Sequence, residues 1–169
     1  MFVLGVDPGL SRCGYGAVAR VHGGLEVVSA GVIRTPPSDP LASRLCSLLS
    51  ELRRLLAERR PDVVVVERVL FQANARTAMG VGQASGVALV AAAEAGCTVV
   101  QYSPNEVKQA VTGYGSADKE QVQRMVQALL RLPERPRPPD VADALALAVC
   151  HLTGTGLRAA VAAAGGAGS

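Results

Sequence analysis

Residues 2–9 read Phe-Val-Leu-Gly-Val-Asp-Pro-Gly, an apolar run that ends in an acidic residue and a turn. Such a run predicts a short buried strand that stops at Asp7. The stretches 15–21 and 25–33 are rich in strand-forming residues and flank a His-Gly-Gly turn at 22–24, so they predict a hairpin. The chain therefore opens with three consecutive strands, and an acid marks the end of the first.

Beyond residue 38 the sequence alternates between helix and strand patterns. Leucines at helical spacing follow a Ser-Asp-Pro start at 38–40 and predict a helix that ends before Pro61. Four valines at 63–66 predict a strand covered on both faces, and Glu67 ends it. A small-residue helix, a fifth strand and three further helices are then expected, in that order, at 75–95, 98–102, 104–111, 118–130 and 140–152.

This order of elements predicts an α/β fold. A strand meander joined to a βαβαβ unit gives a five-stranded mixed sheet, with three antiparallel strands and then parallel ones, and with helices on both faces. The chain has 169 residues, of which 49% are hydrophobic and 18% charged, which fits one domain and excludes an intrinsically disordered protein. We expect that domain to span residues 1–153, followed by a disordered Gly/Ala-rich tail at 154–169.

Composition also bears on location and partners. The four cysteines lie far apart and form no Cys-x-x-Cys pair, so neither a disulfide framework nor a zinc site is supported. The longest uncharged stretch, 77–93, is too short and too polar to span a bilayer, and the chain begins without a basic leader. We therefore expect a cytoplasmic protein that does not associate with a membrane. Its net charge of +3 does not by itself demand a nucleic-acid partner.

Four acids occupy positions that suggest a shared site. Asp7 and Glu67 end two strands that are expected to be parallel neighbours, which would bring their carboxylates side by side. Asp140 and Asp143 are three residues apart in the first turn of a predicted helix and share one of its faces. Taken singly, each acid is better explained as a structural residue: Asp7 as a turn residue, Glu67 as a solvated strand end and Asp140 as a helix cap.

Convergence of all four acids would need a compensating charge. Two unit charges about 4 Å apart repel by about 4 kcal/mol at an effective dielectric of 20, and divalent cations would offset that repulsion. A site made only of carboxylates suits Mg²⁺, with Mn²⁺ as a substitute. Two such ions per subunit, bridged by Asp7, would support hydrolysis of a phosphodiester with water as the nucleophile.

Several residues near these acids are candidates for contact with nucleic acid. Lys108 and Lys119 each stand near a helix start, and they are either solvated surface lysines or phosphate contacts beside the metals. Phe71 follows Glu67 in a loop, where it either packs down or stacks on a base. Arg76 lies at the far end of that loop, where it can reach a backbone phosphate.

Three glycines at 80, 82 and 86 interrupt the predicted helix at 75–95, and each costs about 1 kcal/mol relative to alanine inside a helix. Close approach of another element would compensate for this cost. That element is either the sheet of the same chain or a second subunit.

Six motifs in series resemble RuvC-type Holliday junction resolvases. The resemblance extends over about residues 2–152, in order and at compatible spacings, and it rests on Gly-Val-Asp7-Pro-Gly, Val-Val-Glu67-Arg-Val, Gly-Gln83-Ala-Ser-Gly, Glu-Val-Lys108-Gln, Asp-Lys119-Glu-Gln-Val and Asp140-Val-Ala-Asp143-Ala-Leu-Ala. This family has an RNase H-like fold, in agreement with the strand order predicted above.

The resemblance implies an activity and partners. It implies a Mg²⁺-dependent homodimeric endonuclease that resolves four-way junctions in DNA recombination and repair, by paired symmetric incisions that leave ligatable 5′-phosphate nicks. It implies metal ligands at the four acids, phosphate contacts at the two lysines, a dimer interface on the glycine-bearing helix, and a RuvA–RuvB branch-migration complex as partner. Many members carry Phe where this chain has Leu70, so the junction wedge falls to either Leu70 or Phe71.

Two other functions compete with this interpretation. Asp7-x-Gly9 before a glycine-rich hairpin also resembles the phosphate loop of actin-like and sugar-kinase ATPases. Those folds need two such domains and a second glycine-rich motif, for which 169 residues leave no room. A non-catalytic DNA-binding module is the third possibility, but it gives the four acids no purpose beside a phosphate backbone.

Overall fold

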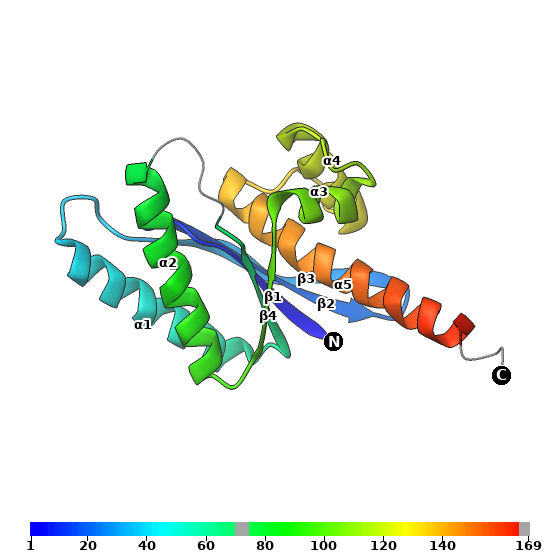
Figure 1. The fold of residues 1–169 in the computed structure, drawn as a ribbon, viewed down its shortest axis with the longest axis horizontal. Coiled ribbons are helices and arrows are strands. Elements are labelled where there is room, and N and C mark those ends of the chain that lie inside the picture. The colour runs from blue at the N-terminus through cyan, green and yellow to red at the C-terminus, as the bar shows by residue number, and fades with distance from the viewer. Residues whose placement is uncertain (70–74, 166–169) are drawn as a thin grey trace.

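A five-stranded mixed sheet in the order β3-β2-β1-β4-β5 forms the centre of the protein (Figure 1). The computed structural model describes the backbone of residues 1–69 and 75–165 and the side chains of 1–69 and 78–154. Its elements, in chain order, are β1 (Phe2–Asp7), β2 (Arg12–Val21), β3 (Gly24–Arg34), α1 (Leu41–Arg59), β4 (Val63–Glu67), α2 (Ala75–Glu94), β5 (Thr98–Tyr102), α3 (Pro104–Thr112), α4 (Lys119–Leu129) and α5 (Pro139–Gly165).

Strand directions confirm the predicted fold class. β2 pairs antiparallel with both β1 and β3, whereas β4 pairs parallel with both β1 and β5. β1 is therefore the strand at which the meander meets the βαβαβ unit, and its carboxyl end lies at a topological switch point. Ligand sites in open α/β sheets are found outside the strand ends at such a point.

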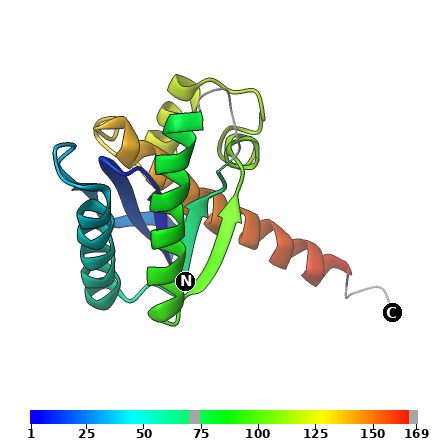
Figure 2. The same cartoon turned by 60° about the vertical axis from the view of Figure 1, so that its left-hand side comes forward.

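Helices cover both faces of the sheet (Figures 1 and 2). On one face, α1 and α2 pack their buried leucines and alanines against Leu4, Val6 and Val64. On the other face, α5 runs across the sheet with α3 and α4 beside it, and this core includes Val3 and Val65. Alternate residues of one strand thus enter opposite cores, as the pleat of a strand requires.

Two element boundaries differ from the sequence prediction. β2 begins at Arg12, three residues before the expected start, because the glycines that lowered its predicted strand content still pair with β1 and β3. α5 continues past Leu152, where its end was predicted, to Gly165. α3 and α4 begin close to their expected positions, each with a capping box, at Ser103 and Asp118 respectively.

Glycines on β1 and β2 allow α5 to lie unusually close to the sheet. A Cβ atom on Gly5 would overlap the carbonyl oxygen of Ala144 and lie 3.0 Å from the amide nitrogen of Ala148. A Cβ on Gly14 would overlap the carbonyl oxygen of Asp140, and one on Gly16 would lie 2.7 Å from the side chain of Leu145. The absence of side chains at these positions therefore sets the height of α5 above β1 and β2.

Among the helices that the structure describes, none combines the length and the apolar character that crossing a membrane requires.

Gly5→Ala is expected to lower the free energy of unfolding by about 1–3 kcal/mol, because the new methyl group forces two packed backbones apart. Chemical denaturation of the purified variant measures this change. Gly154→Ala on α5 is the matched control, since its Cβ would meet no atom of the described part of the chain within 4 Å and alanine is the better helix former. Equal stability of Gly5→Ala and the wild type would contradict the close approach of α5.

Candidate active site

Asp7 and Glu67 lie at the ends of neighbouring parallel strands. Side chains alternate along a strand, and both acids have the same alternation as Val3 and Val65, which pack in the core beneath α5. The two carboxylates therefore emerge on the face of the sheet that α5 covers. The sequence prediction that they would lie side by side agrees with this register.

The other two acids come from the first turns of α5. Asp7 is opposite Gly14 in the β1–β2 ladder, and a Cβ on Gly14 would lie 3.0 Å from the Cβ of Asp140. Asp143 follows one turn later and lines a pocket together with Glu67. The glycine at position 14 thus lets the start of α5 place Asp140 above the end of β1.

Electrostatics show that the four acids share one environment. Burial, followed by the negative charges of Asp143, Glu67 and Asp140, raises the pKa of Asp7 from 3.8 to about 7, with Lys119 acting in the opposite sense. Burial and the charge of Asp143 also raise the pKa of Glu67, which Lys119 again opposes. In the folded protein, burial and mutual repulsion therefore both disfavour the charged forms of Asp7 and Glu67.

Two basic side chains balance the acids of α5. Lys119 Nζ lies 2.7 Å from Asp143 Oδ2, and Arg12 Nη2 lies 2.5 Å from Asp140 Oδ2. Burial lowers the pKa of Lys119, but its hydrogen bond to Asp143 and the nearby carboxylates outweigh that and raise the pKa overall. Arg12 was not among the predicted site residues.

Lys108 and Lys119 line the same pocket beside the acids. The pocket has a volume of about 330 Å³, and Glu67 and Asp143 line it together with both lysines. Hydrophobic residues of α3, α4 and α5 form the rest of its wall. Two positive charges therefore stand at the rim of an acidic centre, where a phosphate group would meet them.

The side chains of the other two candidates for DNA contact, Phe71 and Arg76, lie outside the described residues. Phe71 lies outside the described residues, as does Leu70. Arg76 lies in the first turn of α2, and its side chain is outside the description as well. Base stacking by Phe71 and phosphate contact by Arg76 stay predictions.

The donor chemistry of the four acids fits a hard divalent cation. All four supply carboxylate oxygens, the ligands that Mg²⁺ and Mn²⁺ prefer. Besides burial, the charges of the other three acids raise the pKa of Asp7, and a cation would neutralise that negative charge. Within the residues that the structure describes, no three Asp, Glu, His or Cys side chains are already arranged as a metal cage. Arg12 and Lys119 each hold Oδ2 of one aspartate, so a cation bound by these carboxylates would be repelled by two neighbouring positive charges.

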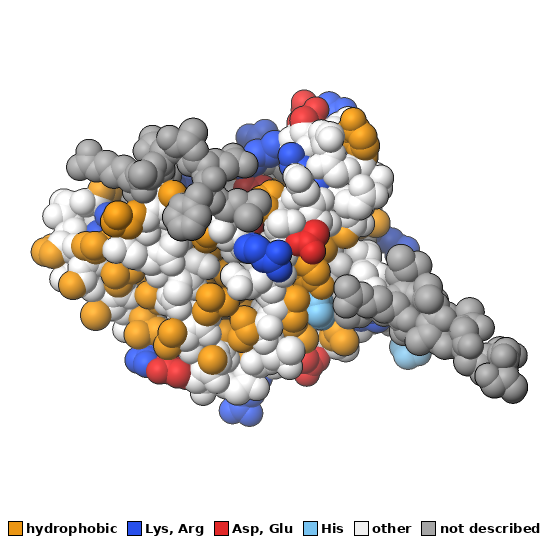
Figure 3. Space-filling view, in the orientation of Figure 1, with side chains coloured by type: hydrophobic (Ala, Val, Ile, Leu, Met, Phe, Trp, Pro, Cys, Tyr) orange, Lys and Arg blue, Asp and Glu red, His pale blue; other side chains and the backbone are white. Residues whose placement is uncertain are grey.

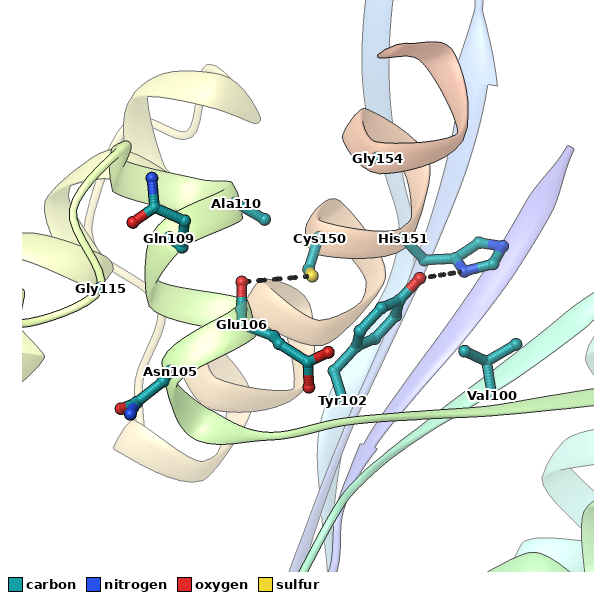
Figure 4. Close-up of a pocket in the computed structure, with 10 residues that line it drawn as sticks. All are labelled: Val100, Tyr102, Asn105, Glu106, Gln109, Ala110, Gly115, Cys150, His151 and Gly154. Carbon is teal, nitrogen blue, oxygen red and sulfur yellow. Dashed lines mark hydrogen bonds between the residues drawn. The ribbon is translucent and has the colours of Figure 1, made fainter. Parts of the chain in front are cut away.

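A larger cavity lies elsewhere, between β5, α3 and α5, and has a volume of about 580 Å³ (Figure 4). Its wall includes Tyr102, whose hydroxyl lies 3.0 Å from Nδ1 of the buried His151. Cys150 Sγ donates a long hydrogen bond to the carbonyl oxygen of Glu106 on the opposite side. None of the four acids lines this cavity, so it is separate from the acidic site.

Known proteins resemble the chain over nearly its full length. The family model described as "Crossover junction endodeoxyribonuclease RuvC" matches residues 3–151. A protein of that name from Salinispora arenicola is 56% identical over 165 residues, which cover 97% of this chain and 94% of the relative.

Solved structures give the same result. Thermus thermophilus RuvC in complex with Holliday junction substrate is 40% identical and superimposes with a TM-score of 0.86, covering 92% of this chain and 94% of that chain. The yeast mitochondrial resolvase Ydc2 has a TM-score of 0.63 at 14% identity, covering 89% of this chain and 78% of that chain, and this similarity concerns the fold alone. The fold is thus that of the RNase H-like resolvases, as the sequence predicted.

The raised pKa of Asp7 predicts a pH-dependent stability of the metal-free protein. Between about 3.8 and 7 the folded chain retains a proton that the unfolded chain has lost, so the free energy of unfolding falls as the pH rises through this window. Raising the pH from about 5 to 7 in EDTA should cost about 2–3 kcal/mol through this group. Denaturant unfolding at each pH measures the effect.

Asp7→Asn removes the titrating group and serves as the comparison. Its stability in EDTA should vary less with pH than that of the wild type, and excess Mg²⁺ should stabilise the wild type more strongly than the variant. Parallel pH profiles for the two proteins would contradict a carboxyl group held near neutral pKa at this position.

Proposed function

The chain belongs to the RuvC family of crossover junction endodeoxyribonucleases, and from this membership we propose how its own residues cut a Holliday junction. The protein is a junction-resolving endonuclease that acts in DNA recombination and repair. The proposal assigns the cleavage to the four acids at the carboxyl ends of β1 and β4 and the start of α5. The observation that carries it is their electrostatic coupling at Asp7 beside two lysines.

RuvC nucleases depend on divalent metal, and we assign the ligands to Asp7, Glu67, Asp140 and Asp143. The proposed ions are two Mg²⁺ per subunit, with Mn²⁺ as a substitute, because carboxylate-only sites favour such cations. Bound there, they would supply an activated water and stabilise the leaving oxygen of the phosphodiester. Cleavage on the 3′-oxygen side of the phosphorus leaves a 5′-phosphate and a 3′-hydroxyl, which a ligase can rejoin.

The remaining assignments concern how the chain holds DNA. Lys119, at the first position of α4, and Lys108, on α3, are proposed to bind backbone phosphates at the rim of the acidic pocket. The same proposal keeps Arg76 as a phosphate contact and Phe71 as a junction wedge. Residues 1–153 form the proposed catalytic unit, and the family match over residues 3–151 supports that limit.

A homodimer is proposed through the outer face of α2. Met79 is 66% exposed and Val90 is 52% exposed on this helix, and among the described residues a Cβ on Gly82 or Gly86 would meet nothing within 4 Å. Figure 3 shows hydrophobic side chains gathered where α2 faces the viewer. Close packing against a second α2 would explain the helical glycines, and two equivalent sites would suit the two-fold symmetry of a junction.

Two further parts of the proposal rest on family membership. The RuvA–RuvB branch-migration complex is the proposed partner on the junction. The proposed location is the cytoplasm, where bacterial chromosomal DNA and its recombination intermediates are found.

Asp7→Asn is expected to abolish junction cleavage, because it removes the carboxylate that touches all three other acids electrostatically. Junction binding should be retained, since the basic rim is unchanged. Cleavage of a labelled mobile four-way junction with Mg²⁺, alongside a gel-shift titration, measures both properties. Asp39→Asn, an exposed turn residue before α1, is the control and should cut normally. A fully active Asp7→Asn variant would refute the assignment of cleavage to the four acids, and equal cutting of junction and linear duplex by the wild type would refute the specificity for junctions.

Val90→Glu is expected to convert the dimer into monomers, because a buried charge without a partner opposes association. Sedimentation velocity of wild type and variant measures the change. Val28→Glu on β3 is the matched control, since Val28 is 47% exposed and lies away from α2. A variant that sediments as the wild type does would exclude α2 as the interface.

A further inference from the structure

Arg12 contacts the active site from a position that neither the fold nor the proposed mechanism requires. It is the first residue of β2, and its guanidinium Nη2 lies 2.5 Å from Asp140 Oδ2 at the start of α5. The Arg12 side chain is 42% exposed and that of Asp140 is 26% exposed. The ion pair therefore stands at the mouth of the acidic centre, where both cations and DNA would approach.

The backbone before Arg12 is held firmly, while its side chain is not enclosed. Thr35 Oγ1 donates a hydrogen bond to the Leu10 carbonyl oxygen at 2.5 Å, and the Thr35 amide donates one to the Ser11 carbonyl oxygen at 3.3 Å. A Cβ on Gly9 would overlap the carbonyl oxygen of Arg12, so the turn is tight. The guanidinium can consequently leave Asp140 by side-chain rotation alone, with its backbone fixed in place.

Two positive charges held by the one carboxylate of Asp140 would repel each other. In the structure its Oδ2 is the acceptor for Arg12, yet the proposed metal centre needs the same carboxylate. Removal of Arg12 from Asp140 exposes a guanidinium beside the acids, and a guanidinium forms paired hydrogen bonds with phosphate oxygens. Under the proposed function, the phosphates that approach this mouth are those of the DNA backbone.

We propose that Arg12 is a positioning counter-ion, which neutralises Asp140 in the metal-free protein, yields it to a divalent cation and then binds a phosphate of the DNA. This inference rests on the proposed function, because it takes Asp140 as a metal ligand and DNA as the substrate. It adds a coupling between the two: cation binding releases the group that holds the DNA, and DNA binding removes the competitor of the cation.

Arg12→Gln should therefore bind divalent cations more tightly. Calorimetric titration of the full chain with Mn²⁺, without DNA, is expected to give a dissociation constant about fivefold lower than that of the wild type, the upper range for an ion pair between partly exposed groups. Arg12→Lys retains the charge and should fall between the two. Unchanged or weaker Mn²⁺ binding by Arg12→Gln would overturn the inference.

Arg34→Gln controls for the loss of one positive charge. Arg34 is exposed and lies directly across from Arg12 in the β2–β3 ladder, and the ion pair of Asp140 is with Arg12 instead. Its Mn²⁺ affinity should change by less than about twofold, as expected for a screened surface charge. An equal gain for Arg34→Gln and Arg12→Gln would reduce the effect to net charge and overturn the specific role of Arg12.

Junction binding tests the second half of the inference. In EDTA, Arg12→Gln should bind the junction within about twofold of the wild type, because Arg12 is engaged by Asp140. With Ca²⁺ as the probe cation its affinity should be several-fold weaker, and its salt dependence should be lower by about one phosphate contact. An equal loss of junction affinity in EDTA and in Ca²⁺ would contradict the movement of Arg12 from Asp140 to a DNA phosphate. Wild-type protein that cuts junctions while these variants fail the tests would refute this inference and leave the proposed function standing.

Discussion

The close approach of α5 to the sheet is the constraint on which the rest of the site depends. Gly5, Gly14 and Gly16 present no side chains to this helix, and its backbone carbonyl oxygens occupy the space where Cβ atoms would be. Interiors are packed too densely to absorb extra atoms there without a shift. Because the two acids of α5 lie in its first turns, the height of the helix also sets their distance from the strand ends.

Strand alternation completes the arrangement. Asp7 and Glu67 emerge on the α5 face because they keep the parity of the buried valines before them, so two strand ends and one helix start contribute carboxylates to the same place. The pKa of Asp7 is raised first by burial and then by the resulting repulsion. Lys119 and Arg12 offset part of it, and the proposed cations would offset the rest. The site is thus acidic at its centre and basic at its rim.

The sequence was sufficient to predict the strand order and the positions of the four acids, because each acid ends an apolar run or begins a helix. It could not reveal Arg12, whose partner lies 128 residues away in sequence and depends on how low α5 sits over Gly14. The early start of β2 was missed for a different reason, since glycine has little strand preference in isolation. The length of α5 was underestimated because its Gly/Ala-rich end carries no periodic apolar pattern.

The most direct test of this account is anomalous diffraction from crystals of the full chain soaked in Mn²⁺. The account predicts anomalous density between Asp7 and the carboxylates of Glu67, Asp140 and Asp143, with Arg12 and Lys119 moved away from Asp140 and Asp143. Density elsewhere on the protein, or none at saturating Mn²⁺ with both ion pairs still in place, would contradict the claim that the glycine-supported approach of α5 builds a divalent-cation centre.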